Sequence, residues 1–126
     1  MWTTGKHVDA SPDVVWRILT DLDLWPKWGP TVSHARLTAG PLGLGARGTV
    51  TTPVGISAPF EITEFEPGHR WAWKVAGIPA TAHGVTPQQS GCRVWMSSPV
   101  WAPAYLPVLA VAVHRIAEMA GHVNAG

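Results

Sequence analysis

His83 is the titratable side chain that the sequence places on the inner face of a predicted strand. In ATAHGV, residues 80–85, the side chains of Thr81, His83 and Val85 point to one side of the strand. A neutral imidazole there is suited to general acid–base catalysis near neutral pH, or to a hydrogen bond with a ligand carbonyl. A histidine satisfied within the core is the third interpretation. His83 is therefore the candidate catalytic residue, with both alternatives open.

Two neighbouring predicted strands supply apolar side chains to the same face. In HRWAWKV, Trp71 and Trp73 alternate with the charged Arg70 and Lys74, so the two indoles face inward. In CRVWMSS, Arg93 faces outward, and the inward set is then Cys92, Val94 and Met96.

The result is a predicted concave face suited to a flat aromatic or polycyclic ligand. Its candidate ligand-binding residues are Trp28, Trp71, Trp73, Thr81, Val94, Met96, Trp101 and Tyr105. Trp25 and Trp28, in the short segment DLDLWPKW, are predicted to wall this pocket, or else to plug one end of the core.

The sequence predicts no metal site and no cofactor. Four further histidines show no metal-ligand spacing with a supporting carboxylate: His34, His69, His114 and His122, the last two lying two helical turns apart. No G-x-S-x-G is present, and Cys92 begins a strand without an activating base. The glycine-rich GPLGLGARG leads into a strand rather than a helix, which predicts a hairpin loop and not a phosphate cradle.

Three carboxylates follow one another along a further strand. Glu61, Glu64 and Glu66 flank Ile62 and Phe65. A regular strand would place these two apolar side chains on opposite faces, which predicts a β-bulge. Which glutamate faces inward stays open, and an outer, solvated position is the simpler interpretation for each.

Composition limits the class of protein. The 126 residues suit a single domain, 1–126, and only 13% are charged while 46% are hydrophobic. The net charge of +1, without a basic run, disfavours nucleic-acid binding. No signal peptide is visible, and the longest apolar stretch, 102–113, is too short for a bilayer. A cytoplasmic location is therefore expected.

Helices are predicted at the two ends of the chain. Ser11 as N-cap, Pro12 at the first position and Asp13 mark the start of a helix that is followed by a short helical fragment ending at Gly29. A closing helix is predicted for residues 105–120. One face of it carries Leu106, Leu109, Val113, Ile116 and Ala120, and its outer side Val108, Val111 and Ala112, apolar enough to suggest a homodimer.

Between the helices, alternation and turn residues predict an antiparallel meander. The expected strands are 32–37, 46–52, 57–66, 69–75, 80–85 and 92–98, after a first strand at 2–9. A three-residue loop at 76–78 pairs Trp71 with His83 and Trp73 with Thr81. A four-residue loop at 87–90 pairs Val85 with Cys92 and His83 with Val94. The order of elements predicts an α+β fold with helices on one face of a curved sheet.

Four stretches in this order resemble one family. DASPDVVWRILTDLDLWPKWGPTVSHARL, GPLGLGARGTV, FEITEFEPGHRWAWKV and AHGVTPQQSGCRV are similar to the polyketide cyclase/dehydrase and lipid-transport family of the START-like (SRPBCC) superfamily, over residues 5–98. The resemblance implies a helix-grip fold, in which six to seven strands wrap around a long C-terminal helix, with a deep cavity for an apolar small molecule. The connection SPVWAPAYLP departs from the usual pattern at the pocket mouth.

Three functions fit these observations. The first is a carrier or binding protein for an apolar small molecule. The second is a polyketide cyclase or dehydratase that uses His83 as a proton shuttle. The third is a non-catalytic interaction module in which the tryptophans fill the cavity.

Overall fold

The computed structural model describes the backbone of residues 1–125 and the side chains of residues 1–121, so the side chain of His122 lies outside the described residues. The strands are β1 (Trp2–Val8), β2 (His34–Leu37), β3 (Arg47–Thr51), β4 (Ser57–Glu66), β5 (Arg70–Val75), β6 (Ile78–Pro87) and β7 (Cys92–Ser98). The helices are α1 (Pro12–Thr20), α2 (Trp25–Trp28) and α3 (Leu106–Ala125), with short 3₁₀ turns at Leu22–Leu24 and Pro103–Tyr105.

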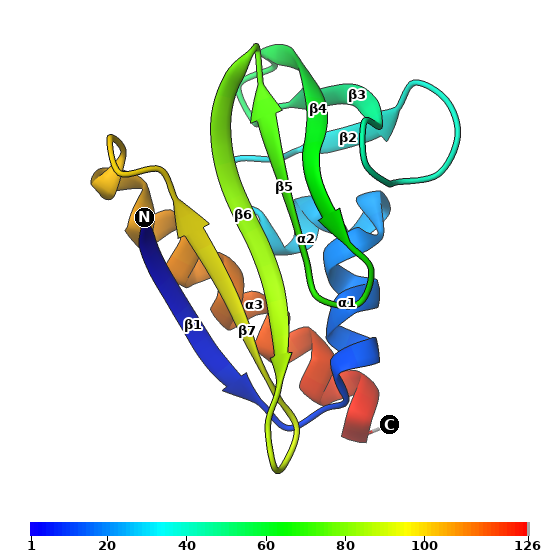
Figure 1. The fold of residues 1–126 in the computed structure, drawn as a ribbon, viewed down its shortest axis with the longest axis vertical. Coiled ribbons are helices and arrows are strands. Elements are labelled where there is room, and N and C mark those ends of the chain that lie inside the picture. Colours follow the sequence, from blue (N-terminus) through cyan, green and yellow to red (C-terminus); the bar gives the residue numbers. More distant parts are fainter. Residues whose placement is uncertain (126) are drawn as a thin grey trace.

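The strands form one antiparallel sheet in the order β1-β7-β6-β5-β4-β3-β2. Helix α3 packs on β1 and β7, α1 packs on β6, and α1 and α2 both contact α3 (Figure 1). The sheet curves around α3, with the short helix pair inserted after β1. The predicted α+β helix-grip fold is therefore confirmed.

The predicted start of α1 is confirmed. Ser11 caps the helix by accepting a hydrogen bond from the backbone N–H of Val14, and Pro12 and Asp13 occupy its first turn. The helix buries Val15, Ile18 and Leu19 against the sheet and α3. This position aims the carbonyl end of α1 into the protein core.

The β5–β6 hairpin has a tighter turn than predicted. Ala76 and Gly77 have φ angles of 52° and 78°, which makes a two-residue hairpin turn instead of the predicted three-residue loop. A bulge just after Ala72 absorbs the difference, so Trp71 stands opposite His83 as predicted. The predicted pairing of Trp73 with Thr81 is replaced by a side-chain hydrogen bond.

The predicted register of β6 and β7 is wrong by two residues. Val85 pairs with Val94 instead of Cys92. His83 pairs with Met96 instead of Val94.

Gly91 explains this shift. Its φ of 79° suits a turn and not a strand, so the four-residue loop spans Gln88 to Gly91 and lies one position later than predicted. A shift by an even number of residues leaves every side chain on its original face. The predicted inward set of β7 is accordingly fully buried: Cys92, Val94 and Met96.

The outer side of α3 is less apolar than predicted. Ala112 is buried and Val108 half-buried, while Val111 is exposed. Ala112 lies three residues after Leu109 and four before Ile116, and this spacing places all three on the inner face. A homodimer through this helix stays a prediction. Most of the apolar surface that suggested it is buried inside the protein.

Among the described residues, no helix combines the length and the hydropathy that crossing a membrane requires.

Candidate functional site

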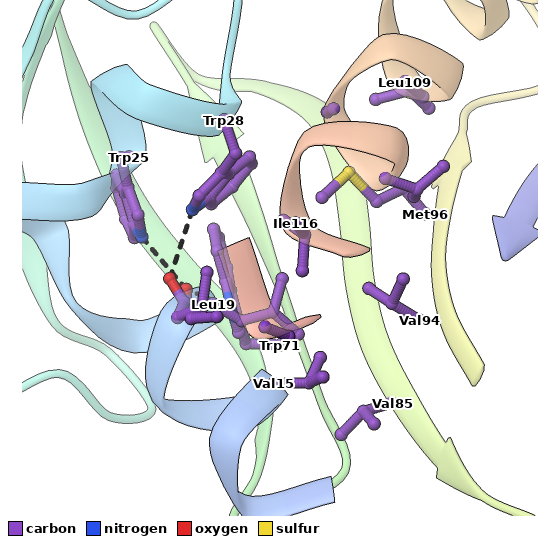
Figure 2. Close-up of a cluster of buried hydrophobic side chains, with 14 of the residues drawn as sticks. Val15, Leu19, Trp25, Trp28, Trp71, Val85, Val94, Met96, Leu109 and Ile116 are labelled. Carbon is purple, nitrogen blue, oxygen red and sulfur yellow. Dashed lines mark hydrogen bonds between the residues drawn. The ribbon is translucent and has the colours of Figure 1, made fainter. Parts of the chain in front are cut away.

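Three indoles converge on the carbonyl end of α1. Trp25 and Trp71 donate their ring N–H groups to the carbonyl of Leu19, at 3.0 and 3.1 Å, and Trp28 donates to the carbonyl of Ile18 at 3.1 Å. Figure 2 shows the dashed bonds from Trp25 and Trp28 to this end of α1. The last carbonyls of a helix have no partner within the helix, and burying them unpaired is costly. The segment LWPKW thus supplies both apolar bulk and the donors that this buried helix end requires.

The same rings form an aromatic stack between the sheet and the helices. The ring of His83 stacks on Trp71 with centroids 3.9 Å apart, and Trp71 stacks on Trp25 at 5.0 Å. Trp73 meets Trp71 edge to face at 5.5 Å and Phe60 at 5.3 Å. Rings in contact on this scale fill the space between the sheet and the helices.

What remains of the inner space is small. A void of about 30 Å³ lies between α2, α3 and the sheet; its lining includes Trp28, Trp71, His83, Met96 and Leu109. A buried water needs about 10–15 Å³ on the same measure. This inner void therefore has room for a water or a single functional group, and not for the deep-bound ligand that the resemblance implies.

A larger apolar groove opens beside the void. It has a volume of about 430 Å³ and lies between the ends of β3, β5 and β6 and the segment that joins β7 to α3. Its walls carry Val50, Trp73, Ile78, Trp101 and Tyr105 among others. We call this feature the mouth groove, and its volume lies within the 300–1,000 Å³ typical of small-molecule sites.

The mouth groove and the inner void share one wall. The residues that line both are Thr31, Val32, Trp73, Thr81 and Tyr105. Across this wall the hydroxyls of Thr31 and Tyr105 form a hydrogen bond of 2.9 Å, which ties the loop after α2 to the 3₁₀ turn that precedes α3. These side chains therefore lie between the groove and the void.

A short polar chain runs from the shared wall to His83. The indole N–H of Trp73 donates to Thr81 Oγ1 at 3.0 Å, and Thr81 Oγ1 is 2.9 Å from His83 Nε2. His83 is only 2% exposed, and its Nδ1 is buried without a hydrogen-bond partner.

Burial lowers the pKa of His83 to about 3. A weak hydrogen bond with the backbone of Trp71, outside regular hydrogen-bond geometry, raises the pKa and offsets the effect of burial only in part. The imidazole is therefore neutral throughout the physiological range of pH.

The three glutamates lie away from the void. Glu61 pairs with Arg47 at 3.0 Å and with Lys74 at 3.7 Å, and Glu64 pairs with Arg70 at 2.5 Å. Glu66 is exposed. The predicted bulge is present between Ile62 and Glu64. Glu61 and Glu64 thus form surface ion pairs, and none of the three glutamates lines the inner void.

Among the described residues, no metal site and no reactive thiol accompanies His83. No group of three or more histidine, cysteine or acidic side chains there is arranged to hold a metal ion. Cys92 is buried, and burial raises the pKa of its thiol. A protonated, inaccessible thiol is a poor nucleophile.

The structure separates the predicted site residues into four groups. Trp28, Trp71, His83 and Met96 line the void, while Trp73, Thr81 and Tyr105 line both spaces. Trp101 is 66% exposed and lines the mouth groove alone, and Val94 lies in the core and lines neither space.

Sequence reasoning missed most of the groove lining, including two of its apolar residues. Ile78 and Val50 belong to the mouth groove. Ile78 is an apolar residue directly after a Gly turn, which was the available signal, because an exposed isoleucine at a turn is poorly placed for a core.

Comparisons with known proteins agree with this architecture. The family model described as polyketide cyclase/dehydrase and lipid transport matches residues 2–120. A search of functionally curated proteins found no match.

Solved structures share the fold at low sequence identity. A protein from Nitrosomonas europaea is 19% identical, with a TM-score of 0.71 and coverage of 98% of this chain and 96% of that one. The Aha1 dimer from Colwellia psychrerythraea gives 16% identity, a TM-score of 0.71 and 95% coverage of both chains. Norcoclaurine synthase from Thalictrum flavum gives 15% identity and a TM-score of 0.64, covering 97% and 94%.

These structural similarities show the fold alone. The family model matches nearly the whole sequence and shows the family. The chain belongs to the polyketide cyclase/dehydrase and lipid transport family.

Proposed function

We propose that this protein binds a flat, apolar small molecule in the mouth groove. The observation that carries the proposal is the groove itself: about 430 Å³ of space walled by apolar side chains, with Trp73, Trp101 and Ile78 exposed to it. Membership of a family described by polyketide cyclisation and lipid transport supports a hydrophobic ligand.

Exposed apolar side chains support a binding role over a purely structural one. Trp101 is 66% and Ile78 55% exposed, although both line the same groove. Leaving such surface in water costs about 25 cal/mol per Å² of apolar area, which a bound ligand recovers. A carrier or binding protein uses that gain as affinity.

Catalysis by His83 is the weaker candidate. A general base works best with a pKa near the operating pH, and burial lowers that of His83 to about 3. The positively charged form, which a general acid of this type requires, is then scarce at neutral pH. Binding is therefore proposed in preference to a proton-shuttling cyclase or dehydratase.

The inner void and the mouth groove also bear on the alternative of a non-catalytic interaction module. A filled interior, as the aromatic stack forms here, is what that alternative predicts. The interaction-module alternative does not account for an apolar groove of ligand size beside the interior. Binding of a small apolar probe in the groove separates the two functions.

The test is a titration with fluorene, a flat tricyclic hydrocarbon, followed by the indole N–H signals in ¹H–¹⁵N spectra. We expect saturable shifts at Trp73 and Trp101. Ile78→Asp places a charge in the groove and should weaken binding at least tenfold. Val54→Asp is the matched control, since Val54 is 81% exposed and lies outside the groove. Absence of saturation in the wild-type protein, or equal weakening by both variants, would contradict the proposal.

A further inference from the structure

Five large apolar side chains are exposed on the segments around the opening of the mouth groove. The turn between β3 and β4 carries Val54 and Ile56, and the start of β6 carries Ile78. The segment between β7 and α3 carries Val100 and Trp101. More than half of the surface of each residue is exposed. We call these five residues the groove rim.

The segments that carry the groove rim border one opening. Thr52, which begins the β3–β4 turn, lines the mouth groove together with Ile78 and Trp101. The indole N–H of Trp2 donates to the carbonyl of Val100 at 3.0 Å, which ties the start of β1 to the same region. In Figure 1 the β5–β6 turn lies at the top of the view and the β7–α3 segment at the upper left.

The stretches that build this end of the molecule contain no charged side chain. Residues 28–33, 48–60, 75–82 and 94–113 include no lysine, arginine, aspartate, glutamate or histidine. Arg47, Glu61 and Lys74 adjoin these stretches, and they pair with one another, Glu61 with Arg47 at 3.0 Å and with Lys74 at 3.7 Å. Protein surfaces that face water normally mix charges of both signs. This end is therefore suited to a partner without net charge.

Polar groups of the turns are hydrogen-bonded within the protein. Thr52 Oγ1 accepts from the N–H of Ile56 at 3.2 Å, and Ser33 Oγ donates to the carbonyl of Thr52 at 2.9 Å. Turn N–H groups donate to nearby carbonyls at 2.8–2.9 Å: Gly55 to Thr52, Ala76 to Pro59 and Ala102 to Pro99. An apolar medium penalises unpaired backbone groups. These bonds let the turns enter such a medium without that penalty.

From these observations we propose that the groove rim docks on a lipid bilayer, with its apolar side chains in the interfacial layer and the mouth groove opening toward the lipid. A zwitterionic bilayer matches the rim in charge, because neither carries a net charge. Tryptophan favours the boundary between lipid and water, and Trp2 and Trp101 are both exposed at this end. The proposal goes beyond the ligand site and does not require the groove to be occupied.

The form of the rim favours lipid over a protein partner. A protein partner would need a surface that fits three separate segments around an opening, and protein interfaces normally have a polar border. The stretches that carry the rim supply no charged side chain for such a border. A fluid bilayer accepts separate apolar projections without a complementary shape, and its affinity scales with the apolar area that is buried.

The test measures co-sedimentation of the protein with vesicles made of phosphatidylcholine alone. We expect the wild type to bind. Val54→Asp and Val100→Asp should each weaken binding at least tenfold, because each places a charge in the apolar layer. Leu44→Asp is the matched control: Leu44 is 73% exposed on the β2–β3 connection, outside the rim, and the variant should bind like the wild type.

Salt and lipid charge separate apolar docking from electrostatic attraction. The rim has no basic side chain, so binding should change by less than about twofold in about 1 M sodium chloride, where charges are screened beyond about 3 Å. Replacing part of the phosphatidylcholine by anionic phosphatidylglycerol should also have little effect. Binding that requires the anionic lipid, or that is lost in salt, would overturn the proposal.

The remaining outcomes keep this proposal apart from the proposed function. Wild-type protein that ignores the vesicles, or equal weakening by Leu44→Asp and Val54→Asp, overturns lipid docking. If the wild type is a dimer by light scattering, does not bind vesicles, and becomes a monomer in Val54→Asp, the rim belongs to a second copy instead. Val54 lies outside the groove, so Val54→Asp should lose vesicles and keep fluorene. A wild type that binds vesicles but not fluorene overturns the proposed function alone.

Discussion

Trp25 and Trp71 donate to one and the same acceptor, the carbonyl oxygen of Leu19, while their rings stack with a tilt of only 12°. One residue comes from α2 and the other from β5, so this carbonyl joins the helix pair to the sheet. The neighbouring carbonyl of Ile18 has a single indole donor, from Trp28. The tryptophans of the LWPKW segment are thus the cap of a buried helix end.

Trp28→Phe should destabilise the protein by about 1–3 kcal/mol, because the buried Ile18 carbonyl loses its indole donor. Phenylalanine retains most of the apolar ring, so the loss reflects mainly the hydrogen bond. Urea unfolding measures the change in the free energy of unfolding. Trp95→Phe is the control: Trp95 lies half-exposed on the other face of β7 and should cost clearly less. Equal costs would argue against the capping role.

Stability should fall with acidity through His83. The unfolded chain takes up a proton near pH 6.5, while the folded protein does so only near its lowered pKa of about 3. Between these values the unfolded state binds more protons, so the free energy of unfolding decreases as the pH falls, and above pH 6.5 the contribution is constant. Between pH 7.5 and pH 5 this loss amounts to about 2 kcal/mol.

His83→Phe should lack this loss, since phenylalanine does not titrate. Urea midpoints of both proteins at the two pH values give the comparison, and the titration of the remaining groups is common to both. Parallel losses in the wild type and the variant would mean that His83 is not responsible.

The Thr31–Tyr105 hydrogen bond should contribute about 1 kcal/mol of stability. In a double-mutant cycle, Thr31→Val and Tyr105→Phe should each remove this contribution, and the double variant should lose little more than either single one. The exposed hydroxyl pair of Thr51 and Ser57 is a control in which we expect coupling close to zero. Full additivity at Thr31 and Tyr105 would show that the shared wall is not held by this bond.

Trp101→Ala should separate binding from stability. Its side chain is 66% exposed, so unfolding should change by no more than about 0.5 kcal/mol, while the affinity for fluorene falls about threefold to tenfold. Calorimetric titration and thermal melting measure the two quantities. Leu44→Ala, at a 73% exposed position outside the groove, should alter neither. An unchanged affinity in Trp101→Ala would remove this residue from the site.

Local patterns determined most of the secondary structure. Ser11, Pro12 and Asp13 mark the start of α1 because capping depends on residues adjacent in sequence. The alternation around Trp71 and His83 assigned both side chains to the inner face, because successive side chains of a strand point to opposite sides. The register of β6 and β7 was less accessible, since it depended on which residue adopts the left-handed turn conformation at Gly91.

The sequence by itself therefore determined the order of the elements, the inward position of His83 and the resemblance to the family. Only the tertiary structure decided that Trp25 and Trp71 stack and reduce the inner void to about 30 Å³, and that Trp101 lies outside it in the mouth groove. The physical reason is that periodicity reports the direction of one side chain at a time. The volume of a cavity is the remainder after side chains from several distant segments have packed together, and no single segment encodes it.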